Sequence, residues 1–221
     1  MDVIQALEQR KSVRAYTNQA VSIETINEIL AAASHSPSGA NTQPWQVVVL
    51  SGDAKQEMGE KLGVAFREGH KSKKDYSYYP VKWIEPYIGR RRACGFQLYN
   101  TLGIDKGDRQ RRLDQWAANY HAFGAPVMLL FFIDPILEKG SYIDYGMFLQ
   151  SIMLAAVDKG LATCPQAALG EYPDVVKGVL EIDDDATLLG GMALGYEDKT
   201  ALVNSYRTPR ESVESFTRYF S

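Results

Sequence analysis

The start of the chain shows hydrophobic residues at helical spacing in two places. Asp2 precedes the first set, which predicts a short, capped helix that fades near Arg10. After Ser22, apolar side chains recur every three or four residues, so a second helix is expected to end before Pro37.

Three runs rich in apolar residues predict strands: WQVVVL at 45–50, APVMLLFFID at 125–134 and ATLLGGMALGY at 186–196. The third run contains a glycine pair, which within a strand often marks the close approach of another backbone or a ligand. Helices are expected at about 54–68, 143–160 and 174–180, and the second of these is apolar nearly all round, so it should be buried.

The pattern loosens after residue 70, where aromatic and basic residues are frequent and few clean periods remain up to about residue 115. We expect a variable, partly helical excursion there. The chain shows no internal repeat, low-complexity tract or linker-like shift in composition. Its 221 residues are therefore expected to form a single domain.

The composition is that of an ordinary globular protein, with 45% hydrophobic and 23% charged residues. A net charge of −3 gives no general attraction to nucleic acid or to a membrane surface, so neither is expected as a partner. The longest apolar run is too short to span a bilayer. Because Cys94 and Cys164 match no metal or redox spacing and no secretory signal is evident, we expect a cytoplasmic protein with free thiols.

The run RKSVRAY at 10–16 is the first candidate for chemistry. If this segment is extended, its two-residue period places Arg10, Ser12 and Arg14 on one side. Two guanidinium groups with a hydroxyl between them match a phosphate dianion, whereas the alternative is a solvated basic patch at a helix C-terminus. Arg207 and Arg210 could approach the same phosphate, or be ordinary surface arginines.

Two further runs offer groups suited to a flat ligand. SPSGANTQPW at 36–45 combines turn formers with the amides of Asn41 and Gln43, which can bond a heterocycle's edge. A plain helix-to-strand connection is the other interpretation. TCPQAALG at 163–170 has small residues against which a planar ligand can lie, with Gln166 near the ring edge, or is simply part of the core.

Other familiar site patterns are absent from the sequence. The histidines at 35, 70 and 121 form no metal or nucleophile motif, and there is neither a GxGxxG nor a Walker loop. The acidic run at 183–185 is interpreted as solvated. The basic run at 90–92 has two interpretations, an exposed helix face or a group that attracts a carboxylate or phosphate.

Four runs occur in a recognisable order: RKSVRAY, SPSGANTQPWQVVVL, YGMFLQSIMLAAVDKGLATCPQAALG and GGMALGYED. Together they resemble the FMN-dependent nitroreductase family, in particular its nitrobenzoate-type branch. The resemblance implies an α+β fold, with a mixed β-sheet flanked by helices, in an intertwined homodimer that holds FMN at its interface. Residues 70–120, which the resemblance does not cover, would form a lid or substrate pocket within one FMN-binding domain, 1–221.

The resemblance also implies roles for individual residues. The element that holds the flavin's phosphate and pyrimidine edge matches Arg10, Ser12 and Arg14, and a further backbone contact matches Lys11. The loop that reaches the flavin from the other subunit matches Pro37, Ser38, Gly39 and Asn41. The segment near flavin N5 matches Pro165, Gln166, Ala167 and Ala168. The C-terminal phosphate contact matches Arg210, with Arg207 one residue off the commonest spacing.

An enzyme of this kind needs no protein nucleophile, because the flavin carries the chemistry. The resemblance implies that NADH or NADPH passes hydride to N5 and leaves, after which a small aromatic substrate, a nitroaromatic or a quinone, takes the same place in a ping-pong reaction. Two alternatives stay open. One is a reductive dehalogenase or flavin-modifying enzyme on the same fold, and the other is a non-enzymatic flavin-binding dimer.

Overall fold

A four-stranded sheet in the order β1-β2-β4-β3 forms the centre of the computed structural model, which describes residues 1–182 and 185–221. The strands are Gln46–Ser51 (β1), Val127–Ile133 (β2), Ala162–Gln166 (β3) and Thr187–Gly195 (β4). The helices are Val3–Gln9 (α1), Ile23–Ala33 (α2), Gly52–Glu68 (α3), Tyr87–Thr101 (α4), Arg109–Ala117 (α5), Lys139–Asp158 (α6), Pro173–Leu180 (α7) and Val213–Phe216 (α8). Short 3-10 turns lie at Gly39–Asn41 (η1), Ala122–Gly124 (η2), Ala167–Gly170 (η3) and Leu202–Asn204 (η4).

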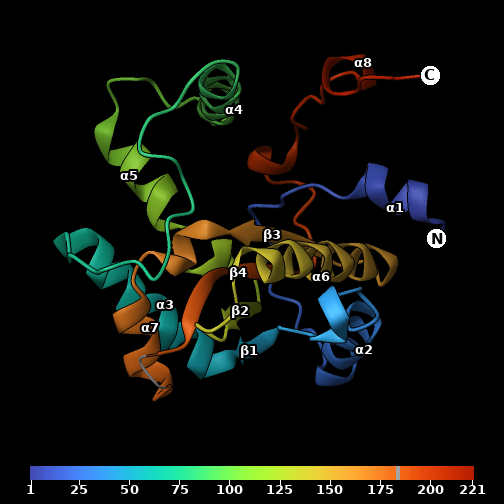
Figure 1. The fold of residues 1–221 in the computed structure, drawn as a ribbon. Helices are drawn as coiled ribbons and strands as arrows, with labels where there is room; N and C mark the ends of the chain where they lie inside the picture. The colour runs from blue at the N-terminus through green and yellow to red at the C-terminus, as the bar shows by residue number, and fades with distance from the viewer. Residues whose placement is uncertain (183–184) are drawn as a thin grey trace.

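The named strands pair antiparallel, and Ser12 adds a parallel bridge to Thr163 at the β3 edge. Helices cover both faces of the sheet (Figure 1). This arrangement confirms the expected α+β fold with helices flanking the sheet. The expected mixed pairing is not found among the named strands, which are all antiparallel, and the Ser12 bridge is an isolated parallel contact.

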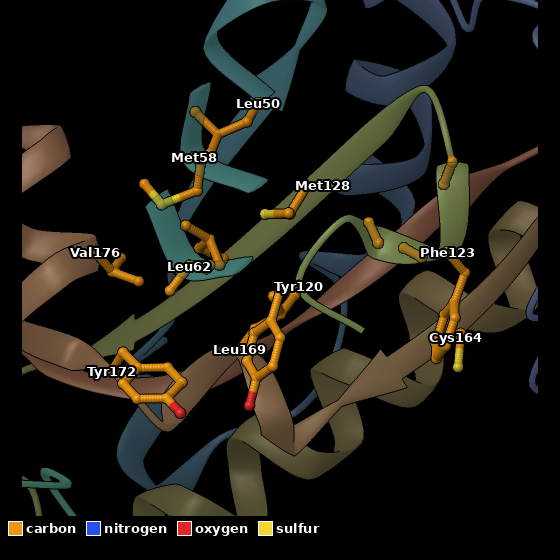
Figure 2. Close-up of a cluster of buried hydrophobic side chains, with 14 of the residues drawn as sticks. Leu50, Met58, Leu62, Tyr120, Phe123, Met128, Cys164, Leu169, Tyr172 and Val176 are labelled. Atoms are coloured by element: carbon orange, nitrogen blue, oxygen red, sulfur yellow. The ribbon is translucent and has the colours of Figure 1, made fainter. Parts of the chain in front are cut away.

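β2 is buried along its whole length because helices pack on both of its faces. Met128, Leu130 and Phe132 point to one face of the sheet and join a cluster with Leu62 of α3 and Val176 of α7, which Figure 2 shows in close-up. The remaining residues of β2, Leu129 among them, join a second cluster with Ile152 of α6 and side chains of α2. Each large apolar side chain in these layers contributes about 1.5–3 kcal/mol by leaving water.

Local signals in the sequence account for most of the element boundaries. Asp2 accepts a hydrogen bond from the Gln5 N–H, so the predicted cap of the first helix is confirmed. The second helix starts after Ser22, as expected, and Ser22 caps it by accepting from the Thr25 N–H. α6 begins at residue 139, four positions before the predicted start, and β3 is a strand that the pattern did not separate from a loop. Of the acidic run predicted to be solvated, Asp185 is exposed, and positions 183 and 184 lie outside the described residues.

The glycine pair in β4 marks a close backbone approach, as predicted. A Cβ atom built on Gly190, where φ is +133°, would lie 2.9 Å from the Gln166 carbonyl oxygen. On Gly191 it would lie 2.5 Å from the Leu129 carbonyl oxygen. Because no side chain fits at either position, β4 can hold the end of β3 and the start of η3 closely.

Candidate functional site

Segment 10–14 runs along the outer edge of β3 in an extended conformation. Besides the Ser12 bridge, the Val13 N–H donates to the Thr163 carbonyl oxygen at 3.0 Å. The Val13 side chain is buried beneath the segment. Arg10, Ser12 and Arg14 line a cavity of about 500 Å³. Val13 thus faces away from the arginines as the predicted alternation requires, whereas Lys11, predicted on the same side as Val13, also lines the cavity.

Positive charge is concentrated in this first cavity, because Arg207 and Arg210 of the C-terminal segment line it together with Arg10 and Arg14. Burial lowers the pKa of Arg10 from its ordinary value, and the charges of Arg210 and Arg207 lower it further. Within the part of the chain that the structure describes, none of these four guanidinium groups has an Asp or Glu oxygen within 4.0 Å. An anion with several acceptor oxygens would offset this repulsion, and a phosphate has that chemistry.

The two C-terminal arginines already make backbone contacts. Arg207 donates to the carbonyl oxygens of Gln9 at 3.0 Å and Arg10 at 2.7 Å, where α1 ends. Arg210 donates to the Thr208 carbonyl oxygen at 3.1 Å, within its own turn. Because both terminal nitrogens of Arg207 already donate to carbonyl oxygens at the end of α1, Arg207 is less available to a ligand than Arg210.

Asn204, which the sequence did not single out, ties the arginine segment to the C-terminal part of the chain. Its Oδ1 accepts from the Arg14 N–H at 2.8 Å, and its Nδ2 donates to the carbonyl oxygens of Ala15 at 2.8 Å and Asp198 at 2.9 Å. Its own carbonyl oxygen accepts from Lys11 Nζ at 2.6 Å. Asn204 is only 4% exposed. No local pattern could have indicated this role, because its partner Arg14 lies 190 positions away along the chain.

The Lys11 ammonium is directed into the protein. Besides Asn204, it contacts Glu197 Oε1 at 2.7 Å, and both side chains of this ion pair are largely buried. The backbone is thus the part of Lys11 that stays available to a ligand, as the predicted role requires.

A second cavity, of about 520 Å³, adjoins the first, and Arg14 and Cys94 line both. One wall of the second cavity is the end of β3 and the start of η3, namely Cys164, Pro165, Gln166, Ala167 and Ala168. Side chains of α4 and α5, which were not resolved as helices in the sequence pattern, contribute another wall. The structure therefore brings the arginine run and the TCPQAALG run together.

Gln166 is buried and held in place. Its Nε2 donates to the Asn119 carbonyl oxygen at 2.8 Å, whereas its Oε1 has no hydrogen-bond partner among the described residues. Leaving such an oxygen unpaired costs about 1–3 kcal/mol, so a ligand that carries an N–H donor fits beside it. Asn119 also lines the second cavity and gave no signal in the sequence.

The two cysteines differ in environment. Burial raises the pKa of the Cys164 thiol to about 11, although Arg14 and Ser12 oppose this rise. Cys164 therefore stays protonated at neutral pH and serves as packing beneath the cavity. Cys94 is exposed where the two cavities meet.

Across the described ranges, no group of His, Cys, Asp and Glu could hold a metal ion, and no helix is long and apolar enough to cross a membrane.

The loop at 37–41 lies apart from these cavities. The Gly39 N–H donates to Asp144 Oδ2 of α6 at 3.0 Å, and no residue of the loop lines either described cavity. In Figure 1, this loop lies beside α2, and α6 separates it from α1. Within one chain, then, the loop does not join the other predicted site residues.

The backbone of this loop is strained. Ala40, Asn41 and Gln43 have φ values of +49°, +58° and +47°, a left-handed region that costs about 1 kcal/mol or more for residues such as Ala and Gln. Trp45 anchors the end of the loop by stacking on Phe148 of α6, with ring centroids 4.7 Å apart. Because strain of this kind concentrates where a ligand or partner is bound, the loop remains a candidate contact for another molecule.

Comparison with known proteins agrees with this geometry. The chain matches the Nitroreductase family over residues 7–196. It is 40% identical to a 4-nitrobenzoate reductase from Pseudomonas putida, over 95% of this chain and 92% of that protein. It is also similar to the solved structure of NfnB, an FMN and NADPH-dependent nitroreductase from sphigopyxis sp. strain HMH. The TM-score is 0.97, and the two chains are 35% identical over the full length of both. A second solved structure, NfnB from Mycobacterium smegmatis in complex with NADPH, gives a TM-score of 0.93 at 34% identity, again over both full chains. The chain belongs to the nitroreductase family.

Proposed function

We propose that this protein is an FMN-dependent oxidoreductase that uses NADH or NADPH to reduce nitroaromatic compounds or quinones. The observation that carries the proposal is the group of four arginines without carboxylate partners, set beside a wall of small residues at the end of β3. The names of its relatives support the same activity, since they include nitroreductases described as FMN and NADPH-dependent.

Each part of the site would hold a different part of FMN. The phosphate and the pyrimidine edge would be held by Arg10, Ser12 and Arg14, with the backbone of Lys11 beside them. Arg210, and less directly Arg207, would approach the phosphate from the C-terminal segment. The ring system would lie along Pro165, Gln166, Ala167 and Ala168, where the unpaired Oε1 of Gln166 can accept a hydrogen bond.

FMN, when bound, would supply the redox chemistry that carries a hydride from the nicotinamide nucleotide to the second substrate. The protein's part is to orient and to stabilise. The guanidinium groups of Arg10 and Arg14 favour negative charge at the pyrimidine edge, which makes the cofactor a better hydride acceptor. Because Cys164 stays protonated, its sulfur does not compete as a thiolate for the electrophilic substrate.

The purified protein is expected to be yellow, to bleach when NADH or NADPH is added without oxygen, and to regain its colour when 4-nitrobenzoate or a quinone follows. Steady-state double-reciprocal plots should give parallel lines, because the nicotinamide leaves before the second substrate binds. Protein that stays colourless after incubation with FMN contradicts the proposal. A yellow protein that neither NADH nor NADPH bleaches favours a non-enzymatic flavin-binding dimer, and reoxidation by a halophenol alone favours a dehalogenase.

We also propose that two copies of the chain form a homodimer in which the loop at 37–41 contacts the FMN held by the partner. The loop lies too far from its own cavities to line them, yet its backbone is strained. In addition, apolar side chains of both termini are exposed, including Ile4 of α1 and Phe216 and Phe220 of the C-terminal segment. Burial of these side chains by a second copy would stabilise such an assembly.

Mixed dimers test whether the loop acts across the interface. One chain carries Arg14→Ala and the other carries Asn41→Trp, a bulky change at an exposed position of the loop. If the loop serves the partner's site, one site of the mixed dimer combines two unaltered halves, so about half a flavin per chain is retained. The homodimer of either variant should bind little FMN. A mixed dimer without flavin, or an Asn41→Trp homodimer with full flavin content, would show that this account of the loop is wrong.

A further inference from the structure

The α4 and α5 wall of the second cavity carries Arg91, Arg92 and Arg112, which we call the arginine rim. Aromatic side chains are interleaved with the rim around the same cavity, including Tyr79, Tyr99 and Trp116. The first cavity already accounts for the arginines of the predicted phosphate site. The rim is a separate basic group, on helices that were not recognisable in the sequence.

The rim arginines differ from their immediate neighbours in their partners. Arg90 pairs with Glu211 at 3.1 Å, and Arg111 lies 3.8 Å from Asp108 Oδ2. None of the three rim guanidinium groups has an Asp or Glu oxygen within 4.0 Å in the described residues. Each rim arginine thus faces the cavity without a carboxylate partner, whereas its neighbour Arg90 or Arg111 has one; Arg109 of α5 also has none among the described residues, but it does not line the cavity.

Two rim arginines are held against aromatic rings. The guanidinium carbon of Arg91 lies 5.2 Å from the centroid of the Trp83 ring, and that of Arg112 lies 5.1 Å from the Tyr99 ring. Stacking of this kind restrains the guanidinium plane, and the N–H groups along its edge can still bind an acceptor. Arg112 also donates one bond, from Nη1 to the Lys106 carbonyl oxygen at 3.2 Å.

The one carboxylate on the described lining of this cavity, that of Glu171, is already engaged. Its Oε2 accepts from the Tyr120 hydroxyl at 2.7 Å, and its Oε1 lies 3.3 Å from Lys74 Nζ. Arg14 adds a further positive charge where the two cavities meet. A ligand that enters between α4, α5 and the end of β3 therefore meets aromatic rings and a net positive field.

We propose that the arginine rim binds the carboxylate of an aromatic acid, so that the enzyme prefers carboxylated aromatic substrates over neutral ones. The planar, two-pronged guanidinium groups match a carboxylate, and the interleaved rings match the aromatic body of the same molecule. This inference rests on the proposed function, because it concerns which substrates of that reaction enter the cavity.

The test replaces the rim arginines by glutamine, singly and together, in the flavin-loaded enzyme. Arg90→Gln and Arg111→Gln on the same helices are matched controls. In the triple variant, kcat/KM for 4-nitrobenzoate should fall about tenfold or more, whereas kcat/KM for nitrobenzene should change less than about twofold. The dissociation constant of benzoate, which is not reduced, should rise in parallel when followed by the flavin's absorbance. Raising the salt concentration should weaken benzoate binding in the wild type more than in the variant.

Several outcomes would overturn the inference. One is an equal loss of kcat/KM for 4-nitrobenzoate and for nitrobenzene in the triple variant. Another is a loss of kcat/KM for 4-nitrobenzoate in the two control variants as large as that in the rim variants. A third is a change confined to the KM for NADPH, which would assign the rim to the nucleotide's phosphates. A wild-type enzyme that reduces nitrobenzene and 4-nitrobenzoate equally well would also overturn it, while leaving the proposed function intact. Absence of bound flavin, in contrast, would count against the proposed function itself.

Discussion

Arg14→Ala is expected to weaken FMN binding about 100-fold, on the order of 3 kcal/mol, because it removes a positive charge that lines both cavities. The fold should tolerate this change. Among the described residues, the Arg14 side chain makes one hydrogen bond, to the Ser12 carbonyl oxygen at 3.3 Å, and the backbone N–H that binds Asn204 is kept. The dissociation constant comes from titration of the flavin-free protein, followed by flavin fluorescence.

Two further variants separate charge from geometry at this position. Arg14→Lys keeps the charge and loses the two-pronged donor, so its affinity for FMN should lie between those of the wild type and Arg14→Ala. Arg109→Ala removes an exposed arginine of α5 that is absent from the described lining of both cavities, and it should bind FMN normally. If Arg14→Ala retains FMN through gel filtration as the wild type does, the assignment of this arginine to the cofactor is wrong.

Much of the fold was predictable because its buried elements have clear periods. The run at 125–134 is apolar throughout, as a strand covered on both faces must be, and β2 occupies it. In contrast, α4 has no buried residue, so no apolar stripe distinguishes its sequence from a loop. β3 was ambiguous for another reason. It is a five-residue edge strand that contains Pro165, which cannot donate to a neighbouring strand.

The candidate site was predictable where its residues are adjacent in sequence. The alternation in RKSVRAY placed Arg10, Ser12 and Arg14 on one side, and the structure adds that the edge of β3 holds them there. Local patterns could not indicate contacts made by folding alone. Asn119, just after the C-terminal end of α5, accepts a hydrogen bond from Gln166, and Asn204, near the C-terminus of the chain, accepts one from the Arg14 N–H. A single side-chain amide of this kind has no periodicity and no motif.

Asn204→Ala is expected to affect stability and cofactor binding together. The side chain of Asn204 makes three hydrogen bonds to the backbone, one from the Arg14 N–H and two to the carbonyl oxygens of Ala15 and Asp198. Their loss leaves these partly buried groups unpaired, which should destabilise the flavin-free protein by about 2–4 kcal/mol. The backbone at Arg14 also loses its acceptor, so the arginine is less well placed and FMN should bind about tenfold more weakly. Denaturant unfolding and flavin titration measure the two effects.

A positioning role for Asn204 is separable from a merely structural one by a variant with matched instability. Leu62→Ala empties a fully buried position in α3, at a cost of about 2–5 kcal/mol, and Leu62 lines neither described cavity. If Asn204 positions Arg14, FMN affinity should fall in Asn204→Ala and stay near that of the wild type in Leu62→Ala, measured where both proteins are folded. Asn204→Asp keeps the acceptor for the Arg14 N–H but sets a carboxylate against two carbonyl oxygens, so it should lose stability while retaining more FMN affinity than Asn204→Ala. Equal affinities in Asn204→Ala and Leu62→Ala would mean that Asn204 stabilises the fold without orienting the arginine.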